Sequence, residues 1–226
     1  IVGSECSMFK SALSPLLLCF NTVQQDANNQ SSSPNHYRVI FKNGDDLRQD
    51  QLVIQMIALM DTLLKKVKLD LQLTPYRVLA TSPTSGFVEF VSGSYTLTSI
   101  LESYDRNIRK FLEFHNKNTH VLANVLDTFI RSCAGYCVIS YIFGVGDRHL
   151  ENILMTTSGH LFHIDFSFLF GRDPKIMAPP MKFSAEMVEC MGGSQSDGYL
   201  KFRKYCQLAY NLLRQHANLF INLLTL

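Results

Sequence analysis

The side chains best suited to chemistry are concentrated in two neighbouring stretches of the sequence. Residues 144–152 read GVGDRHLEN, and residues 163–166 read HIDF. They place the side-chain oxygens of Asp147, Asn152 and Asp165 beside two predicted short strands. Carboxylate and amide oxygens are the ligands that Mg²⁺ prefers, and this ion completes its coordination shell with phosphate and water. The pattern therefore predicts a Mg²⁺ site that also binds phosphate.

His149 lies between two of these residues, and a histidine can move a proton at neutral pH. Asp147 is the alternative proton acceptor. Any one of these residues alone is more often a loop-capping or hydrogen-bonding group. The functional interpretation depends on the whole set occurring in one segment, which is much less frequent by chance.

The elements that must position these residues follow from the hydrophobic pattern of the chain. Apolar residues recur at spacings of three and four between residues 45 and 68, which predicts one long helix. Residues 26–36 are polar and predict a loop. Strands are expected at residues 16–20, 37–42, 76–81 and 87–91. The first part of the chain is therefore predicted to be rich in β-structure, with one long helix.

From residue 97 onward the pattern is mainly helical. Helices are expected at residues 97–113, 121–143 and 197–224, and short strands at 153–156 and 161–165. Residues 171–182 contain three of the seven prolines and predict an extended loop. A stretch with glycine and serine near residues 92–95 marks the boundary between the two parts, which together predict an α+β fold.

Composition limits the classes of protein to consider. The 226 residues carry 21 basic and 19 acidic side chains, a net charge of +2, which excludes a strongly basic nucleic-acid-binding protein. Residues 132–146, which no uncharged stretch exceeds in length, are shorter than the roughly 20 apolar residues that a membrane span needs. Six cysteines without paired Cys-x-x-Cys spacing argue against a zinc site and favour a reduced chain.

Longer motifs carry a resemblance to a known family. Asn152 follows Asp147 by five residues and an Asp165-Phe166 pair comes later, the spacing of a protein-kinase catalytic loop whose triplet is inverted here to Asp-Arg-His. Further matching segments are VIFKNGDDLRQDQ at 39–51, LTPYRVLAT at 73–81, SCAGYCVI at 132–139, GRDPKIMAPPMK at 171–182 and MVECMGG at 187–193. Over nearly its whole length the chain resembles the catalytic domain of phosphatidylinositol 3-kinases, and within that group the class III, vacuolar-sorting type.

This resemblance implies a bilobal, protein-kinase-like fold. The N-lobe would comprise residues 1–91, and the mainly helical C-lobe residues 92–226. The C-lobe would contain a catalytic loop at residues 144–152 and an activation loop at 163–183. The resemblance also implies that the chain is truncated at both ends, and that alone it is weak or inactive on membranes.

The resemblance implies six nucleotide-binding residues: Ser11, Lys42, Asp50, Tyr76, Glu89 and Val91. The first two would contact the phosphates of ATP, and the carboxylate of Asp50 would face Lys42 and restrain it. The ring of Tyr76 would line the adenine, whose edge would meet backbone groups of Glu89 and Val91.

In the implied catalytic loop, Asp147 and His149 would orient and deprotonate an inositol hydroxyl, with His149 the favoured base. Arg148 would anchor the loop, while Asn152 and Asp165 would hold the metal. The chain departs from the family pattern directly after this point, because residue 167 is serine where the family's Asp-Phe-Gly motif has glycine.

Three basic residues of the implied substrate loop would bind the lipid headgroup: Arg172, Lys175 and Lys182. With Asp173 they give the loop a charge of +3 − 1 = +2, which fits a headgroup with a single phosphodiester.

The activity implied by the resemblance is transfer of the γ-phosphoryl group of ATP to the 3-hydroxyl of phosphatidylinositol, with Mg²⁺, or Mn²⁺ in its place. The implied partners are a membrane contacted peripherally and a protein-kinase-like regulatory subunit, with no nucleic acid. The implied location is the cytoplasmic surface of endosomal and autophagic membranes. Three alternatives stay open: a metal-dependent phosphoesterase, a lipid-kinase-like protein kinase, and a scaffold without catalytic activity.

Overall fold

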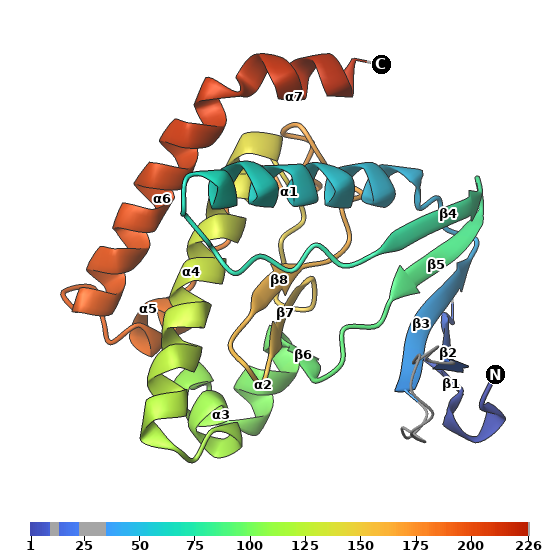
Figure 1. The fold of residues 1–226 in the computed structure, drawn as a ribbon, viewed down its shortest axis with the longest axis horizontal. Helices are drawn as coiled ribbons and strands as arrows, with labels where there is room; N and C mark the ends of the chain where they lie inside the picture. Colours follow the sequence, from blue (N-terminus) through green and yellow to red (C-terminus); the bar gives the residue numbers. More distant parts are fainter. Residues whose placement is uncertain (10–13, 23–34, 226) are drawn as a thin grey trace, which may run out of the picture. The chain divides into compact units, whose positions relative to one another are not determined.

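The computed structural model describes residues 1–9, 14–22 and 35–225 (Figure 1). The chain forms two compact units, the first comprising residues 1–54 and 76–92, and the second residues 55–75 and 93–226. This division differs from a single cut near residue 92, because the long helix α1 (Arg48–Lys66) begins in the first unit and continues in the second. The polar stretch expected to form a loop lies mostly outside the described residues.

The first unit is built on a five-stranded sheet in the order β1-β2-β3-β5-β4, with every neighbouring pair antiparallel. A short 3₁₀ turn, η1 (Gly3–Glu5), precedes it. The strands are β1 (Ser7–Met8), β2 (Leu16–Thr22), β3 (Asn35–Asn43), β4 (Val78–Ser82) and β5 (Ser85–Glu89). The four strands expected from the sequence are confirmed, with ends that shift by one or two residues.

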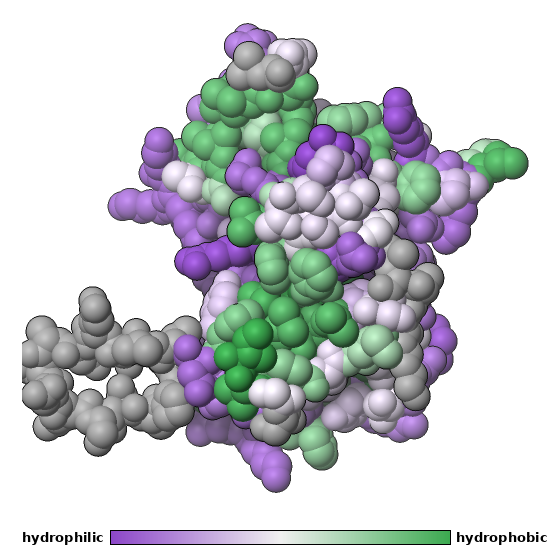
Figure 2. Space-filling view, turned by 90° about the vertical axis from the view of Figure 1, so that its right-hand side faces the viewer, coloured by the Kyte–Doolittle hydropathy of each residue, from purple (hydrophilic) through white to green (hydrophobic). Residues whose placement is uncertain are grey.

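The register of this sheet separates its two faces. Val39 pairs with Glu89, so their side chains share one face, whereas Lys42 pairs with Gly86 on the other. Gly86 lies close to neighbouring backbone, because an added Cβ would be 2.5 Å from the carbonyl oxygen of Leu79. Figure 2 shows hydrophobic side chains gathered over the sheet region of this unit.

The long helix α1 is confirmed, although it begins three residues later than expected. The carboxylate of Asp46 accepts a hydrogen bond from the backbone N–H of Arg48 at 3.1 Å, so the preceding residues form a capping turn instead of a first helical turn. Its apolar stripe is fully buried at Ile57, Met60 and Leu64. Lys65 and Lys66 lie in the last turn, where the helix dipole favours positive charge.

The second unit combines a three-stranded antiparallel sheet, in the order β6-β7-β8, with helices. Its strands are β6 (Ser94–Thr96), β7 (Ile153–Thr156) and β8 (Leu161–His163). Its helices, after the second part of α1, are α2 (Leu97–Ser103), α3 (Ile108–His115), α4 (Thr119–Phe143), α5 (Ala185–Cys190), α6 (Asp197–Gln215) and α7 (Ala217–Leu224). With the first unit, this confirms the α+β class.

Two helices expected from the sequence are wrong in their continuity. The one expected at 97–113 is broken between α2 and α3, where Asp105 and Arg106 adopt left-handed backbone angles of 52° and 56°. The side chain of Asn107 then caps α3 by accepting a hydrogen bond from the N–H of Lys110. The one expected at 197–224 ends at Gln215, and α7 begins after His216.

Helix α4 lies at the centre of the second unit. By length and composition it could cross a membrane, but 67% of its most apolar stretch is buried inside the protein. Gly135 allows close packing, because an added Cβ would lie 2.5 Å from a methyl of Leu73. The buried hydroxyl of Tyr136 donates a hydrogen bond to the carbonyl of Thr74 at 3.1 Å. This helix is therefore the packed core element of its unit.

Candidate active site

The segment that carries the candidate catalytic residues begins where α4 ends. Gly144 adopts a left-handed φ of 53° and caps the helix with hydrogen bonds to the carbonyls of Ser140 and Tyr141. Two residues later the chain contacts the activation segment, that is, the expected activation loop at residues 163–183. Gly146 donates its N–H to the carbonyl of Phe168 at 2.9 Å. A Cβ on Gly146 would lie 2.2 Å from the carbonyl oxygen of Arg172. The two loops therefore pack backbone to backbone.

Arg148 ties the catalytic loop to the segment that holds Asp165. Its side chain is buried, and its Nε donates to the carbonyl of Gly146 at 2.9 Å. One terminal nitrogen donates to the carbonyl of Ile164 at 2.8 Å, and the other to the carbonyl of Asp165. The guanidinium also lies over the ring of Phe166, 5.8 Å from its centre. Arg148 therefore acts as an anchor within the described loop.

Asn152 completes this network from the other end of the catalytic loop. It is buried, and its side-chain amide donates to the carbonyl of Asp147 at 3.3 Å. Its own carbonyl accepts a hydrogen bond from the N–H of Ile164 at 3.0 Å. Hydrogen bonds therefore connect Asp147, Asn152 and the backbone just before Asp165 into one loop cluster.

The two candidate proton acceptors lie side by side. Nε2 of His149 is 3.8 Å from a carboxylate oxygen of Asp147, and the two side chains are 40% and 28% exposed. Both groups therefore reach solvent, and either could meet a substrate hydroxyl. The backbone N–H of Asp147 also donates to the carboxylate of Asp173 at 2.8 Å. Hydrogen bonds to Lys175 and Asp147 backbone lower the pKa of Asp173, so this carboxylate holds the loop as an anion.

Ser167, the residue that departs from the family motif, is bound to the adjacent metal-ligand candidate. Oδ1 of Asp165 accepts hydrogen bonds from the N–H of Ser167 at 3.1 Å and from its hydroxyl at 2.7 Å. The left-handed backbone angles between residues 163 and 183 lie at Asp165, Phe170, Gly171 and Met177 and not at Ser167. The serine therefore needs no unusual backbone angle here, and it orients one oxygen of the carboxylate.

A buried aromatic cluster supports the strand that leads into Asp165. Nδ1 of His163 lies 3.2 Å from the hydroxyl of Ser140, and its ring stacks on Tyr136 with centres 5.2 Å apart. Burial lowers the pKa of His163 to about 3, so the imidazole is neutral at physiological pH. Since this ring is enclosed in the core, His163 serves packing, which weakens the phosphoesterase alternative.

The candidate substrate loop is largely exposed. Arg172 and Lys175 lie in solvent, whereas Lys182 is partly buried. Ile176 and Met177 are each 96% exposed, which is unusual for large apolar side chains. The loop thus presents positive charge and apolar side chains together.

In the first unit, Lys42 on β3 forms an ion pair with Asp45, with 2.9 Å between Nζ and Oδ2. Asp45 was not among the residues named from the sequence, although its spacing of three from Lys42 could have suggested this ion pair. Tyr76 is buried ahead of β4, and Val91 follows β5. Ser11 lies outside the described residues.

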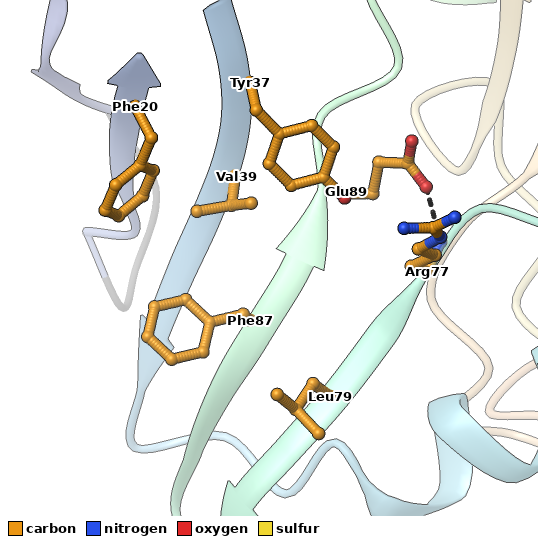
Figure 3. Close-up of a pocket in the computed structure, with 7 residues that line it drawn as sticks. All are labelled: Phe20, Tyr37, Val39, Arg77, Leu79, Phe87 and Glu89. Carbon is orange, nitrogen blue, oxygen red and sulfur yellow. Dashed lines mark hydrogen bonds between the residues drawn. The ribbon is translucent and has the colours of Figure 1, made fainter. Parts of the chain in front are cut away.

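A cavity of about 380 Å³ lies on the sheet of the first unit (Figure 3). Its lining consists of Phe20, Tyr37, Val39, Arg77, Leu79, Phe87 and Glu89. The Glu89 carboxylate accepts a hydrogen bond from the N–H of Arg77 at 2.8 Å. By strand register this cavity opens on the face opposite Lys42, and of the nucleotide-binding candidates only Glu89 is among its lining residues.

Comparison with known proteins shows the family to which the chain is similar. Residues 36–226 match the family described as phosphatidylinositol 3- and 4-kinase. The chain is 52% identical over 227 residues to phosphatidylinositol 3-kinase VPS34 of Arabidopsis thaliana, covering 99% of this chain and 27% of that protein. It is 50% identical to phosphatidylinositol 3-kinase pik3 of Schizosaccharomyces pombe over 233 residues, covering 100% and 28%. With VPS34 of Saccharomyces cerevisiae it shares 50% over 223 residues, covering 97% and 24%.

The chain therefore spans about a quarter of the length of the curated relatives it matches. The similarity covers both units, including the catalytic loop and the activation segment. It confirms the class III resemblance drawn from the sequence motifs and the protein-kinase-like fold that follows from it. The chain belongs to the phosphatidylinositol 3- and 4-kinase family.

Proposed function

We propose that the chain is the catalytic part of a lipid kinase that transfers the γ-phosphoryl group of ATP to the 3-hydroxyl of phosphatidylinositol. The observation that carries this proposal is the loop cluster in which hydrogen bonds hold Asp147, Asn152 and the backbone of Asp165 together. Support comes from identities of about 50% to proteins named phosphatidylinositol 3-kinase. Such kinases use ATP with a divalent metal.

The donor atoms of the cluster fit Mg²⁺, or Mn²⁺ in its place, because they are hard oxygens without a thiolate. Asn152 and Asp165 would hold the ion, and the hydroxyl of Ser167 would orient the Asp165 carboxylate. When bound, the metal neutralises charge on the phosphate groups. Arg148 keeps the two loops that supply these side chains in a fixed relation.

We assign His149 as the base that accepts the proton of the inositol hydroxyl. Asp147, whose carboxylate lies 3.8 Å from its Nε2, would orient the imidazole. Little covalent chemistry falls to the protein in phosphoryl transfer, so most of the acceleration comes from positioning. The rigid connection between the catalytic loop and the activation segment supplies that positioning.

The nucleotide would be held by residues of the first unit. Lys42 and Ser11 would contact its phosphates, with Asp50 near the lysine. Tyr76 would line the adenine, and backbone groups of Glu89 and Val91 would meet its edge. The ion pair between Lys42 and Asp45 restrains the ammonium group before ATP binds.

Arg172, Lys175 and Lys182 would bind the phosphodiester of the headgroup, and a loop charge of +2 favours phosphatidylinositol over headgroups with more phosphates. The exposure of Ile176 and Met177 supports a peripheral contact of this loop with the bilayer. The resemblance further suggests a protein-kinase-like regulatory subunit and action on endosomal and autophagic membranes from the cytoplasm.

The test is a phosphorylation assay with labelled ATP, using phosphatidylinositol in vesicles and in detergent micelles, followed by identification of the phosphorylated ring position. Micelles separate the chemistry from membrane binding, so 3-phosphorylated product is expected at least there. Asp165→Asn should reduce the product by about 10²-fold or more, because it removes a charged metal ligand. Glu102→Gln, at an exposed carboxylate on α2, is the matched control and should retain full activity.

Three other results of this assay would contradict the proposal. Product at the 4-position contradicts the assigned regiochemistry. Phosphorylation of peptides in place of lipid would support the protein-kinase alternative. Nucleotide binding without product in either lipid form would support the scaffold.

A further inference from the structure

We propose that Glu5, Cys19 and His36 form a binding site for Zn²⁺ in the first unit. The three residues come from three segments: η1, β2 and β3 (Figure 1). In the part of the chain that the structure describes, these three side chains of metal-ligating type have donor atoms that all lie within 4.8 Å of one another. This site is separate from the proposed phosphoryl-transfer residues and does not depend on them.

The spacing of the three donor atoms matches one face of a zinc tetrahedron. Sγ of Cys19 is 3.2 Å from Oε2 of Glu5 and 3.4 Å from Nδ1 of His36. The same carboxylate oxygen is 3.6 Å from the imidazole nitrogen. Zinc bonds of about 2.3 Å to sulfur and about 2.0–2.1 Å to nitrogen and oxygen imply tetrahedral edges of roughly 3.3–3.6 Å. The observed triangle therefore needs shifts of only a few tenths of an ångström.

Backbone hydrogen bonds place these side chains before any metal binds. The N–H of Val2 donates to the carbonyl of Cys19 at 2.8 Å, which holds the segment around η1 against β2. In the antiparallel ladder, Cys19 pairs with Arg38 and Asn21 with His36. The donor atoms are therefore brought together by the fold and not by sequence spacing.

The three side chains differ in exposure to solvent, and two of them leave the site accessible to a metal ion. Cys19 is fully buried, while the side chains of Glu5 and His36 are 35% and 36% exposed. A metal ion bound to this face would keep its fourth position toward solvent, where a water can complete the tetrahedron. The mixed sulfur, nitrogen and oxygen donors suit Zn²⁺ better than Mg²⁺ or Ca²⁺.

The nearby positive charge of Arg38 must also be accommodated. Its guanidinium lies 3.1 Å from Oε2 of Glu5. This is the same oxygen that belongs to the triangle, so metal binding at Oε2 would require the guanidinium to move to Oε1 and hold the carboxylate as an outer partner, a common arrangement around metal-ligating carboxylates. The thiolate and the carboxylate together balance the two charges of Zn²⁺, and the thiol proton passes to solvent on binding.

The test is a metal titration of the chelator-treated chain. Co²⁺ alone is added as a spectroscopic probe, because thiolate coordination produces a charge-transfer absorption band that Zn²⁺ then removes when it displaces Co²⁺. Expected are one metal ion per chain and loss of the band in Cys19→Ser. Glu5→Gln and His36→Gln should each weaken zinc binding by more than the roughly 10–100-fold that loss of an outer partner costs.

Cys6→Ser is the matched control, because this thiol lies nearby but donates to the carbonyl of Val2 and is not part of the triangle. It should bind metal like the unaltered chain. The two substitutions at partly exposed residues, Glu5→Gln and His36→Gln, are expected to leave the circular dichroism spectrum unchanged, so their effect reports binding and not unfolding. Absence of saturable binding, or binding that survives Cys19→Ser and Glu5→Gln, would overturn the proposal.

Discussion

At the scale of single residues, buried polar side chains hold the loops of the candidate site in place. Arg148 is 9% exposed, and its guanidinium donates to three backbone carbonyls. Burial of a charge is costly unless such partners are present. A lysine could not replace it, because an ammonium group lacks the planar, five-donor geometry that reaches carbonyls on two loops. Arg148 therefore holds the two loops in place through the directions of its hydrogen bonds as well as through its charge.

His163 gives this scale a measurable pH dependence. Burial lowers its pKa from 6.5 to about 3 in the folded chain. Below pH 6.5 the unfolded chain therefore takes up a proton that the folded chain does not, and the free energy of unfolding falls as the pH falls. The contribution is at most about 1.4 kcal/mol per pH unit down to the folded pKa. We expect urea unfolding of His163→Gln to show a shallower loss of stability between about pH 7 and about pH 5.

His160→Gln serves as a comparison for this prediction, because that ring is only partly buried. Burial lowers its pKa as well, though less strongly, so its substitution should change the pH slope less. Equal slopes for the unaltered chain and His163→Gln would show that the buried imidazole is protonated without unfolding.

At the scale of elements, the sequence pattern predicts those helix and strand ends that neighbouring residues in the chain determine. Strand β7 and the end of α4 at Phe143 match the expected bounds, since both are delimited by polar loop residues and glycine. The break between α2 and α3 was missed, because the hydrophobic spacing continues through a turn that left-handed backbone at Asp105 and Arg106 creates. Strand β6 was missed because three residues in a linker become a strand only by pairing with β7.

The candidate site divides in the same way. The sequence located Asp147, Asn152 and Asp165 because they lie within one short segment with characteristic spacing. It could not locate the contact between Asp147 and Asp173, which joins residues 26 positions apart. The spacing of the cysteines argues against a zinc site. The proposed site of Glu5, Cys19 and His36 draws its side chains from three separate segments, so the spacing of residues along the sequence does not indicate it.

The packing between the catalytic loop and the activation segment yields a prediction at this scale. In Gly146→Ala, the added Cβ would lie 2.2 Å from the carbonyl oxygen of Arg172 and 3.1 Å from Cα of Asp173. Backbone must move, because neither atom belongs to a flexible side chain. We expect a stability loss of about 1–3 kcal/mol in denaturant unfolding. Turnover in the lipid kinase assay should fall by about 10²-fold, because a displacement near 1 Å disrupts positioning.

Gly3→Ala is the matched substitution, because no atom lies within 4 Å of its added Cβ. It should leave both stability and turnover unchanged. Normal turnover in Gly146→Ala would show that the activation segment yields freely and that the two loops need not be held together for catalysis.

At the scale of the whole molecule, the chain is stabilised by packing without covalent cross-links. All six cysteines are free, and four of them are buried: Cys19, Cys133, Cys137 and Cys190. The first of these lies in the first unit and the other three in the second. Each unit therefore contains at least one buried thiol, and chemical labelling of that thiol can report unfolding of the unit.

Thiol labelling of the native chain tests this organisation. Burial raises the pKa values of the Cys190 and Cys206 thiols to about 12, so the reactive thiolate is scarce at neutral pH. We expect alkylation followed by mass spectrometry to modify Cys6 first, and the buried thiols only at the rate of unfolding. All six should react at once in denaturant. Fast native labelling of Cys133 or Cys137 would instead mean that α4 opens to solvent without global unfolding, which its central, buried position makes unfavourable.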